Sequence, residues 1–458
     1  MNPDGPLAPQ RTRLKQLLRL AGPVLVSQLA VMANGVIDTV MAGHLSPTEL
    51  ASLGLGTSIY IIAYVSLLSV LLGLSPIVAQ HFGAGRIDAI GIAFGQSLLL
   101  SILLGALGSM LLLGATNWTH LSGAPPEVAD KVKSYLFWCA LGVIPALIVR
   151  AFSALCTAVS RPRLVMWINL ASLCAKVPLN AILMYGSDAL VIDPMGAAGA
   201  ACSSCLLSYA CAVAVLLVAR RDRAMRPFKL FGSFRPQPKQ LLELLKLGLP
   251  IGGTAFIDVS AFASIALLIA PFGAAASASQ QVASSLTGVA YMFSLALANA
   301  TMVLTAQSLG AGQMQAAREV AGLGMRTAMI TAACIALVLL LGNDLIANAY
   351  ASDPEVAQTA AILIAWLAIH QWLDSLQLQY AFVLRAHKIA NLPFWIYVAC
   401  LWGIGLGGGA WLSFSGWFGP FQDARAFWWA GIVACAAAAI ALRILSQQTW
   451  RRALAPSA

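Results

Sequence analysis

The chain has 458 residues, of which 60% are hydrophobic and only 10% are charged, and its mean hydropathy is +0.82. A soluble globular domain carries about 25% charged residues, so this composition excludes a soluble protein and is typical of a polytopic membrane protein. The formal net charge of +10 could suit a nucleic-acid-binding protein. The basic residues, however, gather at alternate connections between apolar segments, which argues against nucleic-acid binding.

Apolar segments recur along the whole chain and predict an all-α membrane protein with twelve transmembrane helices. Each span needs about 20 apolar residues, and no stretch between the segments is long and polar enough for a soluble domain. The predicted spans are 17–41, 54–79, 90–115, 134–158, 164–186, 197–219, 244–271, 277–306, 319–346, 357–385, 392–416 and 426–446. Residues 11–35 resemble a signal peptide, but the apolar run is too long and lacks a convincing cleavage site, so we expect a retained helix.

Basic residues gather at the even-numbered connections and at both termini, which together hold 22 of the 27 Lys and Arg. Odd-numbered connections hold Lys131, Lys133 and Arg425, while Arg150 and Lys176 lie within spans. Cytoplasmic loops of membrane proteins are enriched in Lys and Arg, so both termini are predicted to be cytoplasmic. The basic side then meets the anionic lipids of the inner leaflet, and nucleic acid is not an expected partner.

Cysteine and nucleotide-binding patterns exclude two further classes of protein. All nine Cys fall inside predicted spans, so no extracellular disulfide framework is expected. Cys202 and Cys205 form a CxxC pattern, but they lie in an Ala-rich helix and are predicted to be packing residues. No GxxxxGK[ST] sequence occurs, so the energy for any transport must come from an ion gradient, a membrane potential or a partner subunit.

The chain repeats itself. LLRLAGP at 17–23 matches LLKLGLP at 244–250, and AQHFGAG at 79–85 matches AQSLGAG at 306–312, both with an offset of 227. PEVA occurs at 126–129 and again at 354–357, with an offset of 228. Six helices in each half make the repeat parallel, which is a hallmark of secondary transporters with a site between the halves.

The repeat sets the predicted domain limits. We expect a first lobe over residues 17–219 and a second lobe over 244–446, joined by a basic cytoplasmic linker over 220–243. Residues 1–16 and 447–458 are predicted to be cytoplasmic end segments.

Three acids lie inside apolar segments: Asp38, Asp258 and Asp374. An Asp at the centre of a transmembrane helix costs roughly 2.5–3.5 kcal/mol, so such residues usually mark an ion or substrate pathway. Asp258 and Asp374 lie in the same half, and adjacent carboxylates in a low dielectric suit a proton carrier. Their oxygens would also suit Na⁺, a hard cation. None of the three has an acid at its repeat-equivalent position.

Lys176 and His370 add titratable groups to the spans. Pairing of Lys176 with Asp38 or another carboxylate is cheaper than isolation, and an ammonium beside Asp38 would take the place of a bound cation. His370 precedes Asp374 by one helical turn and could exchange protons with it.

Several segments together resemble the multidrug and toxic compound extrusion (MATE) family, most closely its NorM-like branch, over residues 14–446. They are LAGPVLVSQLAVMANGVIDTVMAG in the first span, the GAGR turn, KVPLN in the fifth span, LGLPIGGTAFIDVSAF in the seventh and AIHQWLDSLQLQYAFVLRAHK in the tenth. The resemblance implies a twelve-helix, two-lobe antiporter of the bacterial cytoplasmic (inner) membrane. Such proteins export cationic or amphipathic drugs in exchange for inward H⁺ or Na⁺. It further implies a monomer without an enzymatic activity or a cofactor besides the coupling ion.

The resemblance also implies roles for individual residues. Asp38, Asp258, Asp374, Asn180 and Gln281 match coupling positions, with Na⁺ an alternative occupant at Asp258 and Asp374. NorM-like members have Glu at the position of Asp258. Their HQ(I/V)A sequence is QQVA here, so Gln280 occupies the position of their His. In the NorM-like pattern, Asn is common at the position of Lys176 and Tyr is expected at the position of His370. The expected lining of the substrate cavity comprises Lys176, His370, Asn34, Tyr291, Trp372 and Phe256.

Two other functions remain open on sequence grounds. A lipid-linked oligosaccharide flippase of the same wider superfamily would need a cationic cavity for diphosphate, which Lys176 and Arg150 favour and the three acids oppose. An intramembrane aspartyl protease would use two Asp, but neither a GxGD-type sequence nor HExxH occurs. The patterns leave open the substrate, the coupling ion, the stoichiometry and the resting conformation, although the added titratable groups favour protons.

Overall fold

The structure is a computed structural model and describes residues 10–115, 125–188, 191–223, 225–231, 235–350, 353–415 and 425–454. The helices of the first half are α1 (Gln10–Leu45), α2 (Pro47–Leu71), α3 (Leu74–Gly83), α4 (Ile87–Ala115), α5 (Pro126–Ala158), α6 (Pro162–Tyr185), α7 (Ala197–Arg221) and the short η3 (Arg226–Phe228). Those of the second half are α8 (Pro238–Ile269), η4 (Ala270–Phe272), α9 (Ala274–Gly310), α10 (Met314–Leu341), α11 (Asn343–Tyr350), α12 (Pro354–Ala386), α13 (Asn391–Tyr397), the π-helix η5 (Val398–Gly408), α14 (Gly409–Phe414) and α15 (Arg425–Leu454).

Twelve helical segments within the described residues are long and apolar enough to cross a membrane, which confirms the predicted all-α class and the number of spans. Several helices begin before the predicted span. For example, α5 starts at Pro126 and not at residue 134, because its first turns carry charged residues that the apolar pattern does not detect. Proline in the first turn opens α2, α5 and α6, a position where its missing N–H costs no helical hydrogen bond.

The duplication is visible in the turns between helices. After the first hairpin Gly85 has φ +69°, and after the second Gly312 has φ +75°, both in the left-handed region. Ser160 and Lys388, which differ by 228 positions, have φ 60° and 59°. These pairs follow the two offsets found in the sequence, so the repeat extends to the backbone conformation of the turns.

The chain divides into two compact units that do not follow the repeat boundary. The first unit is Val26–Gly252, and the second unit combines Met1–Leu25 with Gly253–Ala458. The start of α1 therefore belongs to the second unit, and the first half of α8 belongs to the first. The predicted lobe limits describe the covalent repeat and stay a prediction.

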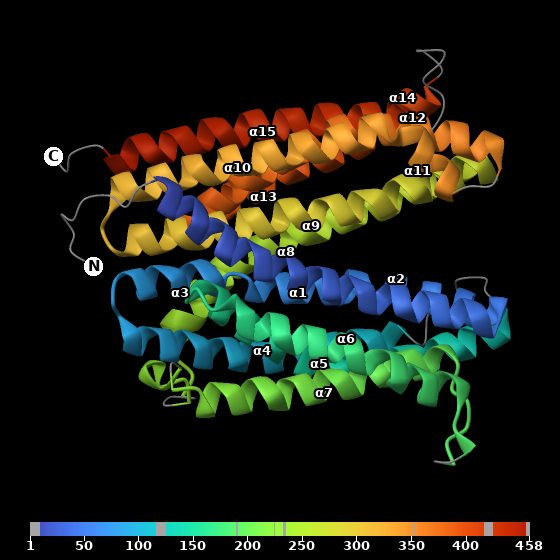
Figure 1. Cartoon of the computed structure of the whole chain (residues 1–458), viewed down its shortest axis with the longest axis horizontal. Helices are drawn as coiled ribbons and strands as arrows, with labels where there is room; N and C mark the ends of the chain where they lie inside the picture. The colour runs from blue at the N-terminus through green and yellow to red at the C-terminus, as the bar shows by residue number, and fades with distance from the viewer. Residues whose placement is uncertain are drawn as a thin grey trace. The chain divides into compact units, whose positions relative to one another are not determined.

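In the first unit, α5 packs against α2, α4 and α7 (Figure 1). The first half of α8 approaches the end of α2 closely, because Gly248 and Gly252 lack side chains there. A Cβ on Gly248 would lie 2.2 Å from the Val70 carbonyl oxygen, and one on Gly252 would lie 2.8 Å from Val70 Cγ2. The break between α2 and α3 falls beside this contact, since a Cβ on Gly73 would lie 3.0 Å from Gly248 N.

In the second unit, α12 is the central helix and packs against α9, α10 and α15 (Figure 1). A buried apolar cluster joins these helices, with Leu363, Ile364 and Leu367 of α12 fully covered. The nine Cys, all within the described residues, are free thiols.

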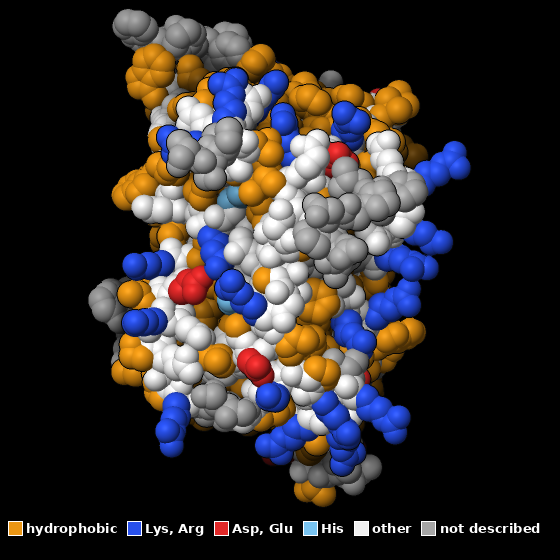
Figure 2. Space-filling view, turned by 90° about the vertical axis from the view of Figure 1, so that its left-hand side faces the viewer, with side chains coloured by type: hydrophobic (Ala, Val, Ile, Leu, Met, Phe, Trp, Pro, Cys, Tyr) orange, Lys and Arg blue, Asp and Glu red, His pale blue; other side chains and the backbone are white. Residues whose placement is uncertain are grey.

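Basic side chains gather at the end of the second unit where α1 starts and α15 finishes. Figure 2 looks onto the side of the chain that includes this end, and it shows many Lys and Arg side chains and few acids over that whole side. Arg13 at the start of α1 forms an ion pair with Glu319 of α10. Lys and Arg side chains are therefore gathered on this face of the chain, and the orientation inferred from the sequence stays a prediction.

Candidate functional site

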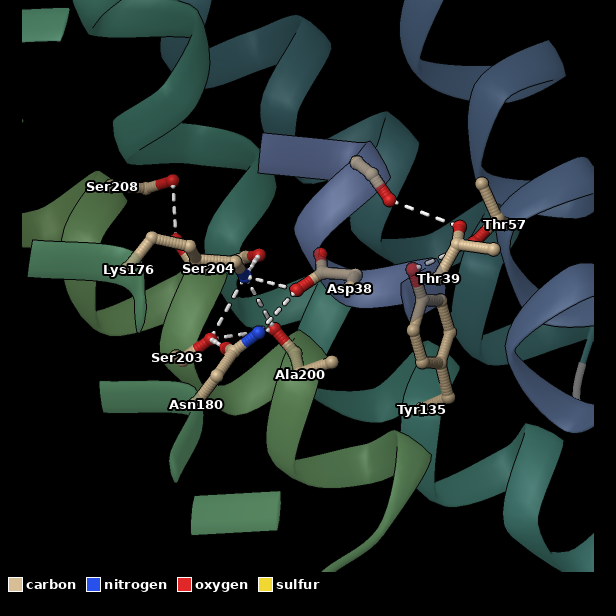
Figure 3. A network of polar contacts seen from close by, with 11 residues as sticks. Asp38, Thr39, Thr57, Tyr135, Lys176, Asn180, Ala200, Ser203, Ser204 and Ser208 are labelled. Atoms are coloured by element: carbon tan, nitrogen blue, oxygen red, sulfur yellow. Dashed lines mark hydrogen bonds and ion pairs between the residues drawn. The ribbon is translucent and has the colours of Figure 1, made fainter. Parts of the chain in front are cut away.

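A buried ion pair joins α1 and α6 in the first unit. Lys176 Nζ lies 2.9 Å from Asp38 Oδ1, and the two side chains are 1% and 14% exposed (Figure 3). The structure thus contains the pairing that the sequence favoured for Lys176. The attraction between the two charges offsets part of the cost of placing each in an apolar region.

Polar groups of α6 and α7 complete the surroundings of the pair. Lys176 Nζ donates to Ser204 Oγ at 2.6 Å, to Ser203 Oγ at 2.9 Å and to the Ala200 carbonyl oxygen at 3.0 Å. Asn180, one turn after Lys176, donates from Nδ2 to Asp38 Oδ1 at 2.6 Å. An ammonium has only three hydrogens, so Lys176 is fully satisfied. Its charge occupies the place beside Asp38 that a bound cation would take.

The serines of this network were not singled out in the sequence. Ser203 also donates to Asn180 Oδ1 and so connects the amide with the ammonium (Figure 3). A signal was present, because ACSSC places two adjacent hydroxyls in an otherwise apolar helix, where buried polar groups need partners. No pattern showed that these hydroxyls would face Lys176.

The second unit holds the other two intramembrane acids, Asp258 on α8 and Asp374 on α12. They are close enough for their charges to interact. Gln377 Nε2 donates to Asp374 Oδ1 at 2.9 Å, whereas the Asp258 side chain makes no hydrogen bond with a described residue. Neither acid forms an ion pair with a Lys or Arg in the described part of the chain. The two acids therefore differ from Asp38, which has its own ammonium.

A polar chain extends from Asp374 along α12 to α15 and α9. Cys435 Sγ lies 3.4 Å from His370 Nε2, and Gln377 Nε2 donates to the same sulfur at 3.5 Å. The His370 ring meets the Trp428 ring edge-on with centroids 5.7 Å apart. Trp428 Nε1 in turn donates to Gln280 Oε1 at 2.8 Å.

Several buried oxygens near Asp374 have no hydrogen-bond partner among the described residues. They are Gln371 Oε1, Ser375 Oγ and Gln377 Oε1, all on α12. Buried polar atoms in folded proteins are nearly always paired with protein, water or an ion. Free oxygens beside a carboxylate are suitable for a water-borne proton or for a hard cation. Unpartnered oxygens thus lie near Asp374 in the second unit, whereas Asp38 in the first unit is paired with Lys176.

The remaining predicted residues are distributed unevenly. Tyr291 interacts electrostatically with both acids of the second unit. Gln281 is exposed and its side chain makes no hydrogen bond with a described residue; Gln280 is the glutamine in the polar chain.

Phe256 and Trp372 are 42% and 40% exposed, and neither forms a polar contact with the acids in the described residues. Asn34 lies in the first unit, where it lines a pocket together with Lys176 and Arg150. The functional roles of these residues stay predictions.

Twelve apolar helices within the described residues, arranged in two repeated halves with charged side chains inside the spans, are typical of a membrane transporter. The profile of the MatE family matches residues 23–182 and 250–411. A probable multidrug resistance protein NorM from Aromatoleum aromaticum is 35% identical over 95% of this chain and 94% of its own length. The multidrug resistance protein PmpM of Pseudomonas aeruginosa is 32% identical over 96% of this chain and 93% of its own.

A solved structure of a MATE protein in the bent conformation has the same fold, with a TM-score of 0.87, 16% identity and 96% of each chain covered. The chain belongs to the MatE family.

Proposed function

We propose that the protein is a secondary active multidrug efflux antiporter that exports organic cations and amphipathic drugs in exchange for an inward coupling ion. The names of its relatives support drug export, and the family membership supports transport over catalysis. The single observation that carries the coupling assignment is the pair Asp258 and Asp374. The charges of these acids interact with each other, unpartnered oxygens of α12 lie near Asp374, and neither acid has a Lys or Arg partner in the described residues.

The mechanism follows from competition for that acidic site. Binding of the coupling ion at Asp258 and Asp374 favours one conformation, and a cationic drug is bound in the conformation from which the ion has left. Coupling of this kind is reciprocal: the ion lowers the affinity for the drug by the same factor by which the drug lowers the affinity for the ion. Alternating access then exchanges the two across the bacterial cytoplasmic membrane.

We assign protons as the coupling ion. His370 lies in the same polar chain as Asp374, and its imidazole can both accept and donate a proton. In the first unit, Lys176 fills the position of a cation beside Asp38, so we expect no Na⁺ there. The alternative coupling ion is Na⁺ bound at Asp258 and Asp374. The proteoliposome experiment at the end of this subsection distinguishes Na⁺ from protons.

The proposed orientation places both termini in the cytoplasm. It is supported by the collection of Lys and Arg on the end of the second unit where α1 starts and α15 finishes (Figure 2). Short basic segments stay on the cytoplasmic side during insertion. We further propose that the protein works as a monomer in contact with the anionic lipids of the inner leaflet.

The flippase alternative has less support. Its diphosphate substrate needs several free cations, but Lys176 is already neutralised by Asp38 and bonded to two serines and a carbonyl group. The acids of the second unit would also repel a diphosphate.

The experiment uses purified protein in proteoliposomes with a fluorescent organic cation, under a pH gradient without Na⁺ and under a Na⁺ gradient at equal pH. We expect efflux with the pH gradient only, and none with Asp374→Asn. Asp88→Asn is the matched control, because Asp88 is an exposed acid paired with Lys229 and should behave as the wild type. Efflux driven by Na⁺ alone would replace protons with Na⁺, and normal efflux by Asp374→Asn would overturn the coupling assignment.

A further inference from the structure

A groove of about 490 Å³ lies between α10 and α15 in the second unit, and neither Asp258 nor Asp374 lines it. Both helices pack on α12, which forms the floor of the groove (Figure 1). The residues that α10 contributes are spaced i, i+3, i+4 and i+7 and so share one helix face. They are Arg318, Ala321, Gly322 and Met325. Ligand pockets typically have volumes of about 300–1,000 Å³, so this groove has room for part of a lipid molecule.

One end of the groove is cationic. Arg318 near the start of α10 and Arg451 in the last turn of α15 line it, and both side chains are exposed. Neither arginine forms an ion pair with a residue that the structure describes. No Asp or Glu belongs to the described lining, because Glu319, the next residue of α10, is paired with Arg13. Two uncompensated guanidinium groups therefore face each other across the mouth of the groove.

Beyond the two arginines the groove is mostly apolar. Met325 lies seven residues further along α10 than the arginine of that helix, which is about 10 Å at 1.5 Å per residue. Ala321, Val383 and Trp450 belong to one buried apolar cluster and form the wall. Gly322 keeps the groove open, since a Cβ on it would meet no atom within 4 Å. The groove thus combines a cationic mouth with an apolar interior.

The equivalent place in the first unit is occupied by the chain itself. The repeat counterparts of α10 and α15 are α4 and α7, and η3 packs against both. Gly91 of α4, which corresponds to Arg318 at the offset of 227, would bring a Cβ within 2.2 Å of the Phe228 carbonyl oxygen. Phe228 and Leu230 are buried there. In the second unit no described segment takes the place of η3, and arginine replaces the glycine that allows its close approach.

We propose that the groove between α10 and α15 binds an anionic phospholipid of the inner leaflet, with the lipid phosphate at Arg318 and Arg451. A guanidinium matches phosphate oxygens with two parallel N–H donors. Basic pockets between transmembrane helices on the cytoplasmic side bind anionic headgroups. An acyl chain would cover the apolar interior, which a soluble phosphate compound would leave in water. The hydroxyl groups of Tyr380 and Ser446 also line the groove and can donate to the ester carbonyl groups of the lipid.

This inference deepens the proposed contact with anionic lipids and rests on the proposed function for one point, the orientation that places the groove in the inner leaflet. It assigns the lipid a defined site on the second unit. The lipid would fill the space between α10 and α15 as η3 fills the space between α4 and α7.

The test is lipid binding to the delipidated full-length protein in detergent, measured by native mass spectrometry. The probes are dioleoylphosphatidylglycerol and dioleoylphosphatidylcholine, which have the same acyl chains but differ in headgroup charge. We expect the first phosphatidylglycerol to bind at least about tenfold more tightly than the first phosphatidylcholine. The double variant Arg318→Gln with Arg451→Gln should lose this preference. Arg326→Gln with Arg443→Gln removes two exposed arginines of the same helices outside the groove and should keep it.

A second variant covers the case in which the double arginine variant does not fold. Gly322→Leu places a side chain in the open groove while both arginines remain, and it should abolish the tight phosphatidylglycerol site. Gly22→Leu is its control, because Gly22 also has no atom within 4 Å of a Cβ and lies outside the groove.

Four results would overturn the proposal. They are equal affinities of the wild type for the two lipids, a preference retained by the folded double arginine variant or by Gly322→Leu, a preference lost equally in the control pair, and binding of glycerol 3-phosphate as tight as that of the lipid. The assay uses no ion gradient. Equal lipid affinities with intact cation efflux therefore refute only this inference, and a phosphatidylglycerol site in a protein without efflux refutes only the proposed antiport.

Discussion

The two units solve the problem of buried charge in opposite ways. In the first unit Asp38 pairs with Lys176 and accepts a hydrogen bond from Asn180, so its charge is balanced within the protein. In the second unit Asp258 and Asp374 have each other's charge nearby and no Lys or Arg partner among the described residues. A duplicated backbone therefore does not imply duplicated chemistry. We infer that one unit keeps a fixed internal cation and the other exchanges a mobile one.

The largest effect is expected when the ammonium of Lys176 is removed from the first unit. Lys176→Met leaves the Asp38 carboxylate unpaired and mostly buried, and breaking a buried pair by deleting one partner typically costs about 3–5 kcal/mol. We expect a clear fall in the thermal midpoint of the purified protein. The same variant should gain stabilisation by Na⁺ that the wild type lacks, because a cation can then replace the ammonium.

The matched control for this variant is the double substitution Lys176→Met with Asp38→Asn, which removes both charges and should recover most of the loss. Lys229→Met breaks an exposed pair, with side chains 73% and 76% exposed, and should change stability by less than about 1 kcal/mol. If the double variant is no more stable than Lys176→Met alone, the pair is not the unit of stabilisation.

The second prediction compares the equivalent helices α1 and α8 near their prolines. Gly248→Ala forces a methyl group against the Val70 carbonyl oxygen, and overpacking of this kind typically costs about 1–3 kcal/mol. Gly22→Ala in α1 meets no atom within 4 Å, so the better helix propensity of Ala should leave the protein unchanged or more stable by up to about 1 kcal/mol. Thermal unfolding of both variants distinguishes them, and equal midpoints would contradict the close approach of α8 to α2.

The smallest predicted effect concerns the turn after α12. The repeat-equivalent residue of His387 in the first half is Val159. The His387 ring packs edge-on against the Trp450 ring, with centroids 4.5 Å apart. Burial lowers the pKa of His387 from 6.5 to about 4. The folded protein therefore favours the neutral ring, whereas the unfolded chain binds a proton below about pH 6.5. The free energy of unfolding therefore decreases as the pH falls from 6.5 toward 4.

The measurement for His387 is the thermal midpoint at pH 7.5 and at pH 5.5, for the wild type and for His387→Val. One pKa unit corresponds to about 1.4 kcal/mol, and partial exposure of the ring reduces the effect, so we expect the wild type to lose about 1 kcal/mol more than the variant. Equal losses in the two proteins would mean that His387 titrates normally.

Much of this architecture could be predicted from the sequence, because apolar length, basic loops and self-similarity are local signals. The offsets of 227 and 228 placed Gly85 opposite Gly312, and the backbone angles of these turns agree. Helix ends were less predictable. The charged first turns of α5 continue a helix that hydrophobicity alone does not mark.

The candidate sites were predictable only in part. The cost of burying an ammonium pointed to a partner for Lys176, and Asp38 is that partner. Ser204, Cys435 and the Trp428–Gln280 hydrogen bond could not be foreseen, because they depend on which faces of distant helices meet.

The central claim is that ion coupling resides in the second unit and not at Asp38. The most direct measurement is efflux of a fluorescent organic cation from proteoliposomes under a pH gradient, comparing Asp374→Asn with the double variant Lys176→Met and Asp38→Asn. We predict that Asp374→Asn abolishes gradient-driven efflux and that the double variant, in which both charges of the Asp38–Lys176 pair are absent, retains most of it. Efflux retained by Asp374→Asn and lost in a folded double variant would place coupling in the first unit and contradict the account.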